Sequence, residues 1–212
     1  MMTMSIHQTD TNSEIEIRRL RQTWAFSRDA GDFDTMSKCF HPDAEASISW
    51  FKGAVRDLTP LLIASDKARK PTEHSKHLLG NCLVHINGDR AVMETDVTIM
   101  MREYIHDQLF DYSGYCRFYD QVERRNGRWA ISLWTAIFDK DRLDPVQGVA
   151  PDWLTDIKLE PGTSGFAFMQ MRQLKKGRQI PADTVMGNSE AERSLRRRYE
   201  AWLSQSTPDS RQ

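Results

Sequence analysis

Two tight-turn signals in the second half of the chain constrain its fold most strongly. Asn87-Gly88-Asp89 and Asn126-Gly127 each separate two long stretches with strand character. Asn and Gly accept the left-handed backbone of a short hairpin turn, so each signal joins two antiparallel strands. The expected strands are 78–86, 90–104, 110–125 and 128–140. Long strands in this succession predict a curved antiparallel sheet.

The first half of the chain predicts helices. Apolar residues recur at helical spacing after Ser13, which forms a capping box with Glu16, and Gly31 is the expected C-cap of this first helix. Asp32 then caps a short second helix, and Pro42 ends it. The inward face of the second helix is expected to carry Phe33, Met36 and Phe40.

A short strand and a third helix complete the expected elements before the sheet. Residues 44–50 alternate and predict a strand, which a turn at Lys52-Gly53 follows. Pro60 suits the first turn of the third helix. The inward residues of that helix are expected to be Leu58, Leu61, Leu62 and Ser65. Three helices followed by a meander predict an α+β domain, with the helices packed on one face of the sheet.

The periodic pattern divides the chain into three parts. Residues 1–12 are expected to be a flexible N-terminus, 13–144 the α+β domain, and 145–212 a C-terminal extension that ends in a helix over 189–204. Isolated aromatic residues in the extension predict that it docks, either on its own domain or on a neighbouring subunit. These aromatic residues are Trp153, Phe166 and Phe168.

Bulk composition excludes several classes of function. The formal net charge is -1, so no broad positive field favours nucleic acid or an acidic membrane. Three dispersed cysteines argue against a disulfide framework. No apolar run approaches the length of about 18 residues that a membrane span needs. The start of the sequence lacks the basic and apolar regions of a signal peptide, so we expect a cytoplasmic protein.

Four short motifs carry a resemblance to a known family. They are residues 27–34, 39–44, 77–81 and 122–129, and their order on helix, strand and hairpin matters more than any one of them. In this order they resemble the SnoaL-like branch of the NTF2-like superfamily, which includes scytalone dehydratase, hexachlorocyclohexane dehydrochlorinase and bile acid 7α-dehydratase. The resemblance covers about residues 14–142 and implies a cone-shaped fold around a ligand pocket.

The resemblance also implies catalytic residues. In the dehydratases of this group an Asp at the end of the first helix pairs with a His at the start of a long strand, and the matching positions are Asp29 and His77. The second pocket histidine of scytalone dehydratase has no counterpart in 99–102. Its Ser/Asn pair is replaced near Cys116 and Phe118. Dehydration of scytalone itself is therefore not expected, although the Asp–His pair is present.

The Asp29–His77 pair would suit proton transfer. Histidine titrates near neutrality, and a carboxylate on one ring nitrogen fixes the tautomer and stabilises the imidazolium. The simpler alternatives are a solvated turn Asp and a structural His. His74 is a weaker candidate base. His74 and His77 on an extended segment would point to different sides, so we expect no metal site, and His41, His85 and His106 are expected to lie at the surface.

The expected pocket wall is aromatic and cationic. Tyr112 and Tyr115 have opposite parity on one strand, so only one of them can face inward. Arg117 shares the parity of Tyr115 and would hold a developing oxyanion if it faced the pocket. The expected substrate-binding residues are Trp24, Arg28, Trp50, His74, Met101, Tyr112, Tyr115, Arg117 and Trp134, with Phe26 and Phe118 as further wall residues.

Together these features predict a lyase that needs no cofactor. Dehydratase-type elimination from a hydrophobic aromatic or polycyclic molecule is the first choice, in the catabolism of aromatic compounds. Loss of formaldehyde or isomerisation of a double bond would use the same residues. The alternatives from other classes are a structural β subunit of a ring-hydroxylating dioxygenase and a ligand carrier without turnover. A homo-oligomer, dimer or trimer, is expected by analogy with the family.

Overall fold

The computed structural model describes residues 11–160 and 162–205. The helices are α1 (Thr11–Ala30), α2 (Phe33–Ser37), α3 (Val55–Lys67), α4 (Asp152–Thr155), α5 (Ala167–Lys175) and α6 (Glu190–Ser204). The strands are β1 (Phe40–Ile48), β2 (Phe51–Ala54), β3 (His74–Asn87), β4 (Arg90–Ile105), β5 (Gln108–Arg125), β6 (Arg128–Pro145) and β7 (Val185–Met186). Within this part of the chain, no helix is both long and apolar enough to cross a membrane.

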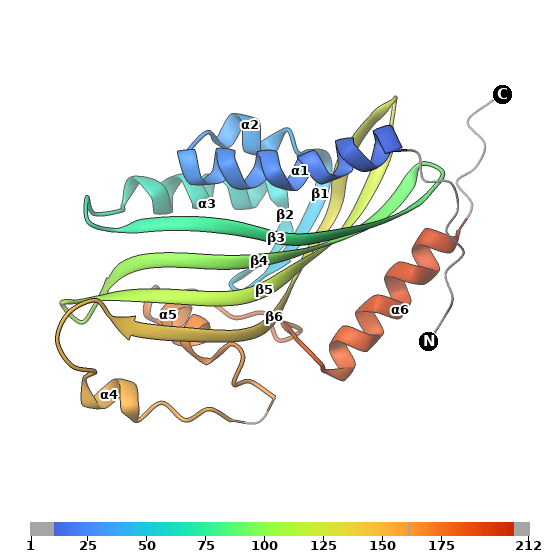
Figure 1. Cartoon of the computed structure of the whole chain (residues 1–212). Helices are drawn as coiled ribbons and strands as arrows, with labels where there is room; N and C mark the ends of the chain where they lie inside the picture. The colour runs from blue at the N-terminus through green and yellow to red at the C-terminus, as the bar shows by residue number, and fades with distance from the viewer. Residues whose placement is uncertain (1–10, 161, 206–212) are drawn as a thin grey trace.

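The strands form one seven-stranded sheet in the order β2-β1-β6-β5-β4-β3, with β7 beside β6. Strands β3 to β6 form the expected antiparallel meander, and β1 returns parallel to β6. Because β2 and β3 lie at the two edges, the curved sheet stays open. Figure 1 shows the long strands sweeping beneath α1, α2 and α3, which lie on one face.

The two hairpin turns have the geometry that their residues predict. Asn126 and Gly127 both take a positive φ, 52° and 76°, and Gly88 takes 59°. At 126–127, two left-handed residues in succession give the type I′ turn that matches the twist of the flanking strands, whereas the turn at 88–89 has one left-handed residue, Gly88. The hairpins over β3–β4 and β5–β6 are confirmed, and their strands extend beyond the expected ends.

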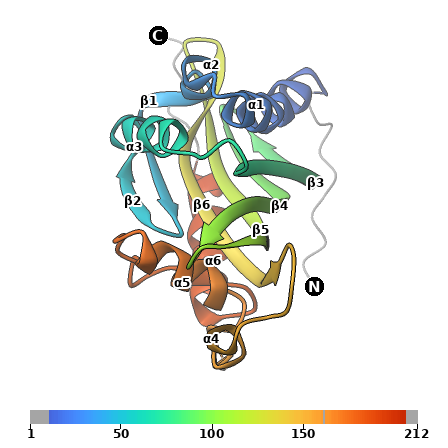
Figure 2. The same ribbon diagram turned by 90° about the vertical axis from the view of Figure 1, so that its left-hand side faces the viewer.

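The inner face of the sheet and one stripe of α1 enclose the main core. Buried residues of α1 recur at spacings of three and four, so the whole stripe faces the sheet. The stripe consists of Ile17, Arg21, Trp24, Ala25 and Arg28. Opposite it, Val97, Phe118 and Trp134 point inward from successive long strands. The helices therefore cover the concave face, and Figure 2 views this arrangement from its open end.

The C-terminal extension docks on its own domain, one of the two outcomes expected. Phe166 and Met169, at the start of α5, join the inner core. Helix α6 lies on the opposite face of the sheet (Figure 1), where Tyr199 stacks on Tyr119 with ring centroids 4.7 Å apart. Ser189 caps α6 by accepting a hydrogen bond from the Glu192 backbone N–H, so this helix begins where the sequence predicts.

Several local expectations about the first two helices are wrong. Residues 11 and 12 already belong to α1, while residues 1–10 of the expected flexible N-terminus lie outside the described residues. Ser13 does not cap the helix; its hydroxyl accepts a hydrogen bond from Trp129 Nε1 at 3.0 Å. Asp32 caps α2 as expected, but α2 ends at Ser37, so Phe40 and Pro42 lie on β1 instead.

The third helix also differs from its expectation. Lys52-Gly53 lies within β2 rather than in a turn, because the chain already reverses between β1 and β2. Pro60 sits inside α3, which starts earlier, at Val55. Leu58 and Leu62 are buried as expected, whereas Leu61 is exposed, because it lies about 100° around the helix from Leu62, at the edge of the buried stripe.

Candidate active site

The last turn of α1 crosses the beginning of β3 and brings Asp29 to His77. The His77 imidazole Nδ1 lies 2.7 Å from Asp29 Oδ1, and the His77 backbone N–H donates to Asp29 Oδ2 at 2.9 Å. Lys76 Nζ lies 3.3 Å from the same carboxylate. The two side chains are each only 8 % exposed. The expected meeting of these residues is confirmed, and their chemical role stays a prediction.

The surroundings set the protonation of both groups. Burial raises the pKa of the Asp29 carboxyl, but the hydrogen bonds from His77 outweigh burial and leave this pKa below its usual value. Burial lowers the pKa of the His77 imidazole, against the opposing effect of the carboxylate. At neutral pH the pair is therefore an ionised Asp29 and a neutral His77 whose Nδ1–H points at the carboxylate.

This tautomer leaves the second ring nitrogen of His77 with a lone pair. Nε2 has no hydrogen-bond partner among the described residues. The ring is fixed on its other side by Trp24, which meets it edge-on with centroids 5.0 Å apart. A neutral imidazole with one nitrogen anchored and the other free is the arrangement that a general base requires.

Below His77, the floor of the cone holds a charged pair that sequence reasoning missed. Arg21 donates from Nε to Asp120 Oδ2 at 2.7 Å and forms a second hydrogen bond from Nη2. Arg21 is 1 % exposed and Asp120 is fully buried. Two signals could have found the pair. Arg21 falls on the apolar stripe of α1, and Asp120 has the inward parity of Phe118.

Aromatic rings surround the Arg21 guanidinium. Its Cζ lies 4.8 Å from the centroids of both Phe118 and Trp134, and 5.1 Å from that of Trp24. The rings offer their negative faces to the cation. Trp24 and Trp134 are expected pocket residues, but the structure packs them around this guanidinium, and neither lines the cavity at the mouth of the cone.

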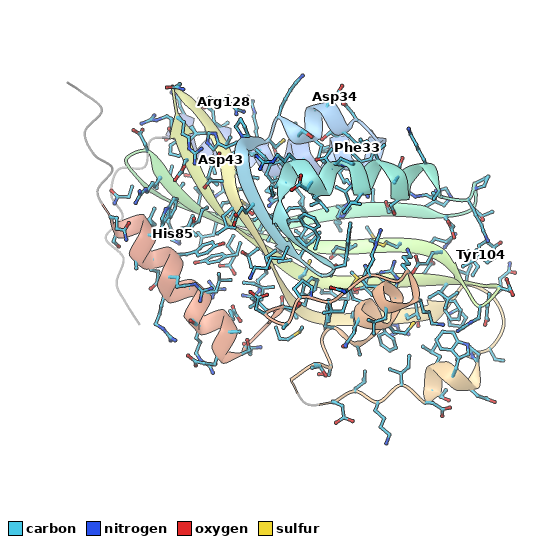
Figure 3. All side chains as sticks on the ribbon, turned by 180° about the vertical axis from the view of Figure 1, so that it is seen from behind. Phe33, Asp34, Asp43, His85, Tyr104 and Arg128 are labelled. Carbon is cyan, nitrogen blue, oxygen red and sulfur yellow. The ribbon has the colours of Figure 1, made fainter. Side chains whose placement is uncertain are left out.

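The open space lies at the mouth of the cone. A cavity of about 410 Å³ is lined by residues of α3, the start of β3, the end of β4 and the α5 region. Figure 3 shows Tyr104, one of its lining residues, at the end of the sheet opposite His85. Asp29 and His77 do not form its wall. Ser75 and Met101 do, and this cross-strand pair lies one pleat repeat of about 7 Å from the pair His77 and Ile99, on the same face of the sheet.

Four of the expected substrate-binding residues line this cavity. They are Arg28, Trp50, His74 and Met101. Tyr112 is buried on the inner face, and its hydroxyl has no hydrogen-bond partner within the described part of the chain. Tyr112, not Tyr115, is therefore the inward tyrosine.

Three expected wall residues face away from the cone. Tyr115 is 39 % exposed and lies under Lys140 Nζ, 4.6 Å from its ring centroid. Arg117 has the same outward parity and pairs with Glu192 beneath α6, so it cannot hold an oxyanion in the cavity. Phe26 is 72 % exposed on the outside of α1.

The described histidines other than His77 show no shared ligand arrangement. Over residues 11–160 and 162–205, no group of three or more His, Cys, Asp or Glu side chains is placed to hold a metal ion. His41 is buried rather than at the surface, because its Nε2 lies 3.0 Å from the Glu123 carbonyl oxygen. Burial lowers the pKa of this imidazole.

Comparison with known proteins places this geometry in context. Residues 9–135 match the family model of the SnoaL-like domain. The chain is also similar to pea pathogenicity protein 2 of Fusarium vanettenii, with 26% identity over 161 residues. That alignment covers 73% of this chain and 66% of the fungal protein, so about a third of the relative has no counterpart in it.

Solved structures share the architecture at low sequence identity. A candidate scytalone dehydratase from Novosphingobium aromaticivorans aligns with a TM-score of 0.55 and 16% identity, over 68% of this chain and 95% of that one. A type 2 hexachlorocyclohexane dehydrochlorinase aligns with a TM-score of 0.51 and 19% identity, over 67% and 95%. At these identities the likeness concerns the fold alone. The expected α+β fold of the NTF2-like superfamily is confirmed.

Proposed function

Because the chain belongs to the SnoaL-like domain family, we propose that it is a lyase that needs no cofactor and removes a proton and a leaving group from a hydrophobic aromatic or polycyclic molecule. One observation carries the proposal. The imidazole of His77 is held through Nδ1 at 2.7 Å from Asp29, and its Nε2 has no hydrogen-bond partner among residues 11–160 and 162–205. That constellation supplies a base without any metal or cofactor.

The proposed reaction uses one residue as base and then as acid. His77 Nε2 takes the proton from an acidic C–H of the substrate, and the electron pair of that bond forms the new double bond. The C–O bond of the adjacent leaving group breaks, and the imidazolium returns the proton so that water departs. Asp29 stabilises the imidazolium between the two steps. Such a base contributes about 10²–10⁴-fold in rate.

The position of the cavity fits a substrate that enters from the mouth. Ser75 and Met101 line the cavity and lie next to the row that contains His77 and Ile99. A molecule seated in the cavity therefore needs to extend by about one pleat repeat to bring its reacting carbon to Nε2.

The names of the similar structures agree with an elimination. A dehydratase removes water and a dehydrochlorinase removes hydrogen chloride, so both names describe eliminations. Loss of formaldehyde and isomerisation of a double bond remain variants of the same proposal, because both also need a positioned base. Assembly into a dimer or trimer and a cytoplasmic location belong to the proposal as well.

The test follows the proton rather than a product. Aromatic and polycyclic alcohols and ketones with an acidic C–H are incubated with the protein in D₂O, and deuterium uptake or elimination is followed by NMR. We expect His77→Ala to slow the reaction by about 10²–10⁴-fold, because the base is lost. His85→Ala is the matched control, since His85 lies on the same strand at the far end of the sheet (Figure 3).

Two results would contradict the proposal. His77→Ala could retain the wild-type rate within a few-fold, which would make the imidazole structural. Alternatively, His77→Ala and His85→Ala, both still folded, could lower the rate equally, which would show that the imidazole of His77 has no special role in the reaction. A structural β subunit or a ligand carrier predicts that no compound reacts with either variant or with the wild type.

A further inference from the structure

The cavity at the mouth of the cone carries a surplus of positive charge. Its lining includes the cations Arg28, Arg69, Arg102, Arg172, Lys176 and Arg178. The acidic residues in the same lining are Glu73 and Glu103. The cations come from α1, from the segment after α3, from β4 and from the C-terminal extension, so separate parts of the chain converge on one space.

Some of these cations are neutralised within the protein. Glu103 binds Arg172 and also accepts a hydrogen bond from Lys176 Nζ at 2.6 Å. Arg102 forms a two-point pair with Asp111, with distances of 2.7 and 2.6 Å. Paired in this way, these side chains shape the cavity wall but keep little charge to offer a ligand.

Arg28 is not neutralised in the same manner. The nearest carboxylate, Asp66, lies 3.9 Å from Arg28 Nη1, whereas Arg69 holds that carboxylate at 2.9 Å. Arg28 Nη1 is buried and has no hydrogen-bond partner in the described part of the chain. A buried guanidinium with an unused donor is costly unless a ligand supplies the acceptor.

Arg178 is the second unneutralised cation. It donates to the Gln173 side-chain oxygen at 2.8 Å and stacks on Trp50, with its Cζ 3.8 Å from the ring centroid. It forms no ion pair with any described residue. The stacking holds the guanidinium flat against the cavity wall, which leaves its remaining N–H groups for a planar anion.

The two guanidiniums also disfavour each other. Burial lowers the pKa of both Arg28 and Arg178. For Arg178, the charge of Glu103 opposes that of its partner Arg172, and the positive charge of Arg28 lowers the pKa further. A negative charge placed between them would relieve this repulsion. A surface that only needed to be soluble would not gather like charges in a concave, half-buried space.

We infer that the cavity binds a carboxylate of the substrate between Arg28 and Arg178, so that the lyase proposed above acts on aromatic or polycyclic acids. That the bound acid is a substrate rests on the proposed function, while the anion site itself rests on the two guanidiniums. The apolar body of the acid would then extend past Ser75 and Met101 toward His77. The C-terminal extension, which supplies Arg178, becomes part of the binding site.

The test compares an acid with its uncharged analogue. Naphthoate and naphthamide are titrated into the full chain by isothermal calorimetry at neutral pH and constant ionic strength. We expect naphthoate to bind at least about tenfold more tightly, because hydrogen bonds to a charged partner are the stronger ones. Arg178→Gln and Arg28→Gln should each remove most of this preference and leave naphthamide binding unchanged.

Matched variants separate a specific site from general charge. Arg142→Gln removes an exposed cation that pairs with Asp144 on β6, and it should leave both affinities within about twofold of the wild type. Arg178→Lys keeps the charge but loses the planar fork, so it should restore only part of the preference. Equal affinities for the two compounds, or no binding of naphthoate at millimolar concentration, overturn the inference.

The same titration in His77→Ala distinguishes the two proposals. If His77→Ala prefers naphthoate as strongly as the wild type but no compound reacts with the wild type, the anion site stands and the lyase proposal fails. If deuterium exchange depends on His77 while naphthoate and naphthamide bind equally, the lyase proposal stands and the anion site fails.

Discussion

The floor and the mouth of the cone both contain buried arginine, and they use it differently. At the floor, Arg21 is held by two hydrogen bonds to Asp120 and enclosed by aromatic rings. At the mouth, neither Arg28 nor Arg178 has an acidic partner at hydrogen-bond distance within the described part of the chain. The contrast teaches that pairing, rather than burial, separates a charge that supports the fold from one that is available to a ligand.

The largest expected effect lies at the floor. Asp120→Asn leaves the Arg21 cation uncompensated inside the cone, so we expect the free energy of unfolding to fall by about 3–5 kcal/mol. Urea denaturation measures it. Replacing both partners with apolar residues, Arg21→Met with Asp120→Leu, should recover most of the loss. An Asp120→Asn protein as stable as the wild type would remove the distinction between floor and mouth.

Between floor and mouth, the Asp29–His77 pair predicts a pH dependence. Because the pKa of His77 lies below its ordinary 6.5, the base stays deprotonated at neutral pH, and activity should fall only as the pH drops below 6.5. Asp29→Asn removes the carboxylate that favours the imidazolium, so the acid limb should move to still lower pH while the plateau rate falls about 10²-fold. A pH–rate profile of deuterium exchange checks both.

The lowered pKa of His77 also predicts how the stability of the fold changes with pH. A histidine with a lowered pKa binds its proton more readily in the unfolded state, so its contribution to stability is complete above pH 6.5 and is lost as the pH falls through 6.5 toward the folded-state value. His77→Gln should therefore flatten the dependence of stability on pH in this window. If the stability of His77→Gln changed with pH as that of the wild type does, a group other than His77 would be responsible for the pH dependence.

At the mouth we expect the opposite of the floor. Arg28→Met removes a buried charge that lacks a close acidic partner, and the stem of the new side chain can still lie against Phe33. Thermal unfolding should show a stability equal to or above that of the wild type. A loss comparable to that of Asp120→Asn would mean that Arg28 is a structural residue, not one available to a ligand.

The smallest effect is expected at the surface. Lys52 pairs with Asp183 and so links β2 to the C-terminal extension, but both side chains are more than half exposed. Lys52→Ala should change the free energy of unfolding by less than about 1 kcal/mol. A larger loss would show that the extension is held mainly by this link, rather than by the burial of Phe166 and Met169.

The sequence predicts the sheet better than it predicts the site. Asn126-Gly127 encodes its turn locally, so the hairpin follows from two residues. Asp29 and His77 lie far apart in the chain, and only the family resemblance suggested their contact. Arg117 shows the limit of local reasoning. Its parity is indeed that of Tyr115, but its acidic partners come from three elements: Glu94 on β4, Asp139 on β6 and Glu192 on α6.

The filling of the cone could not be read from the sequence either. Trp24 and Trp134 are large aromatic residues of the kind that lines ligand pockets. Whether they line a cavity or fill the core depends on how they pack around Arg21. The cationic mouth depends on Arg178, which belongs to a segment without any periodic pattern. Long-range packing of this kind leaves no local trace in the residues that take part.

The protonation state of one imidazole tests the central claim most directly. In protein labelled with ¹⁵N at histidine, NMR reports which ring nitrogen of His77 carries the proton and at which pH the ring becomes charged. The structure predicts a proton on Nδ1, a bare Nε2 at neutral pH and a midpoint below 6.5. A proton on Nε2, or a ring already charged at neutral pH, would contradict the assignment of His77 as the base.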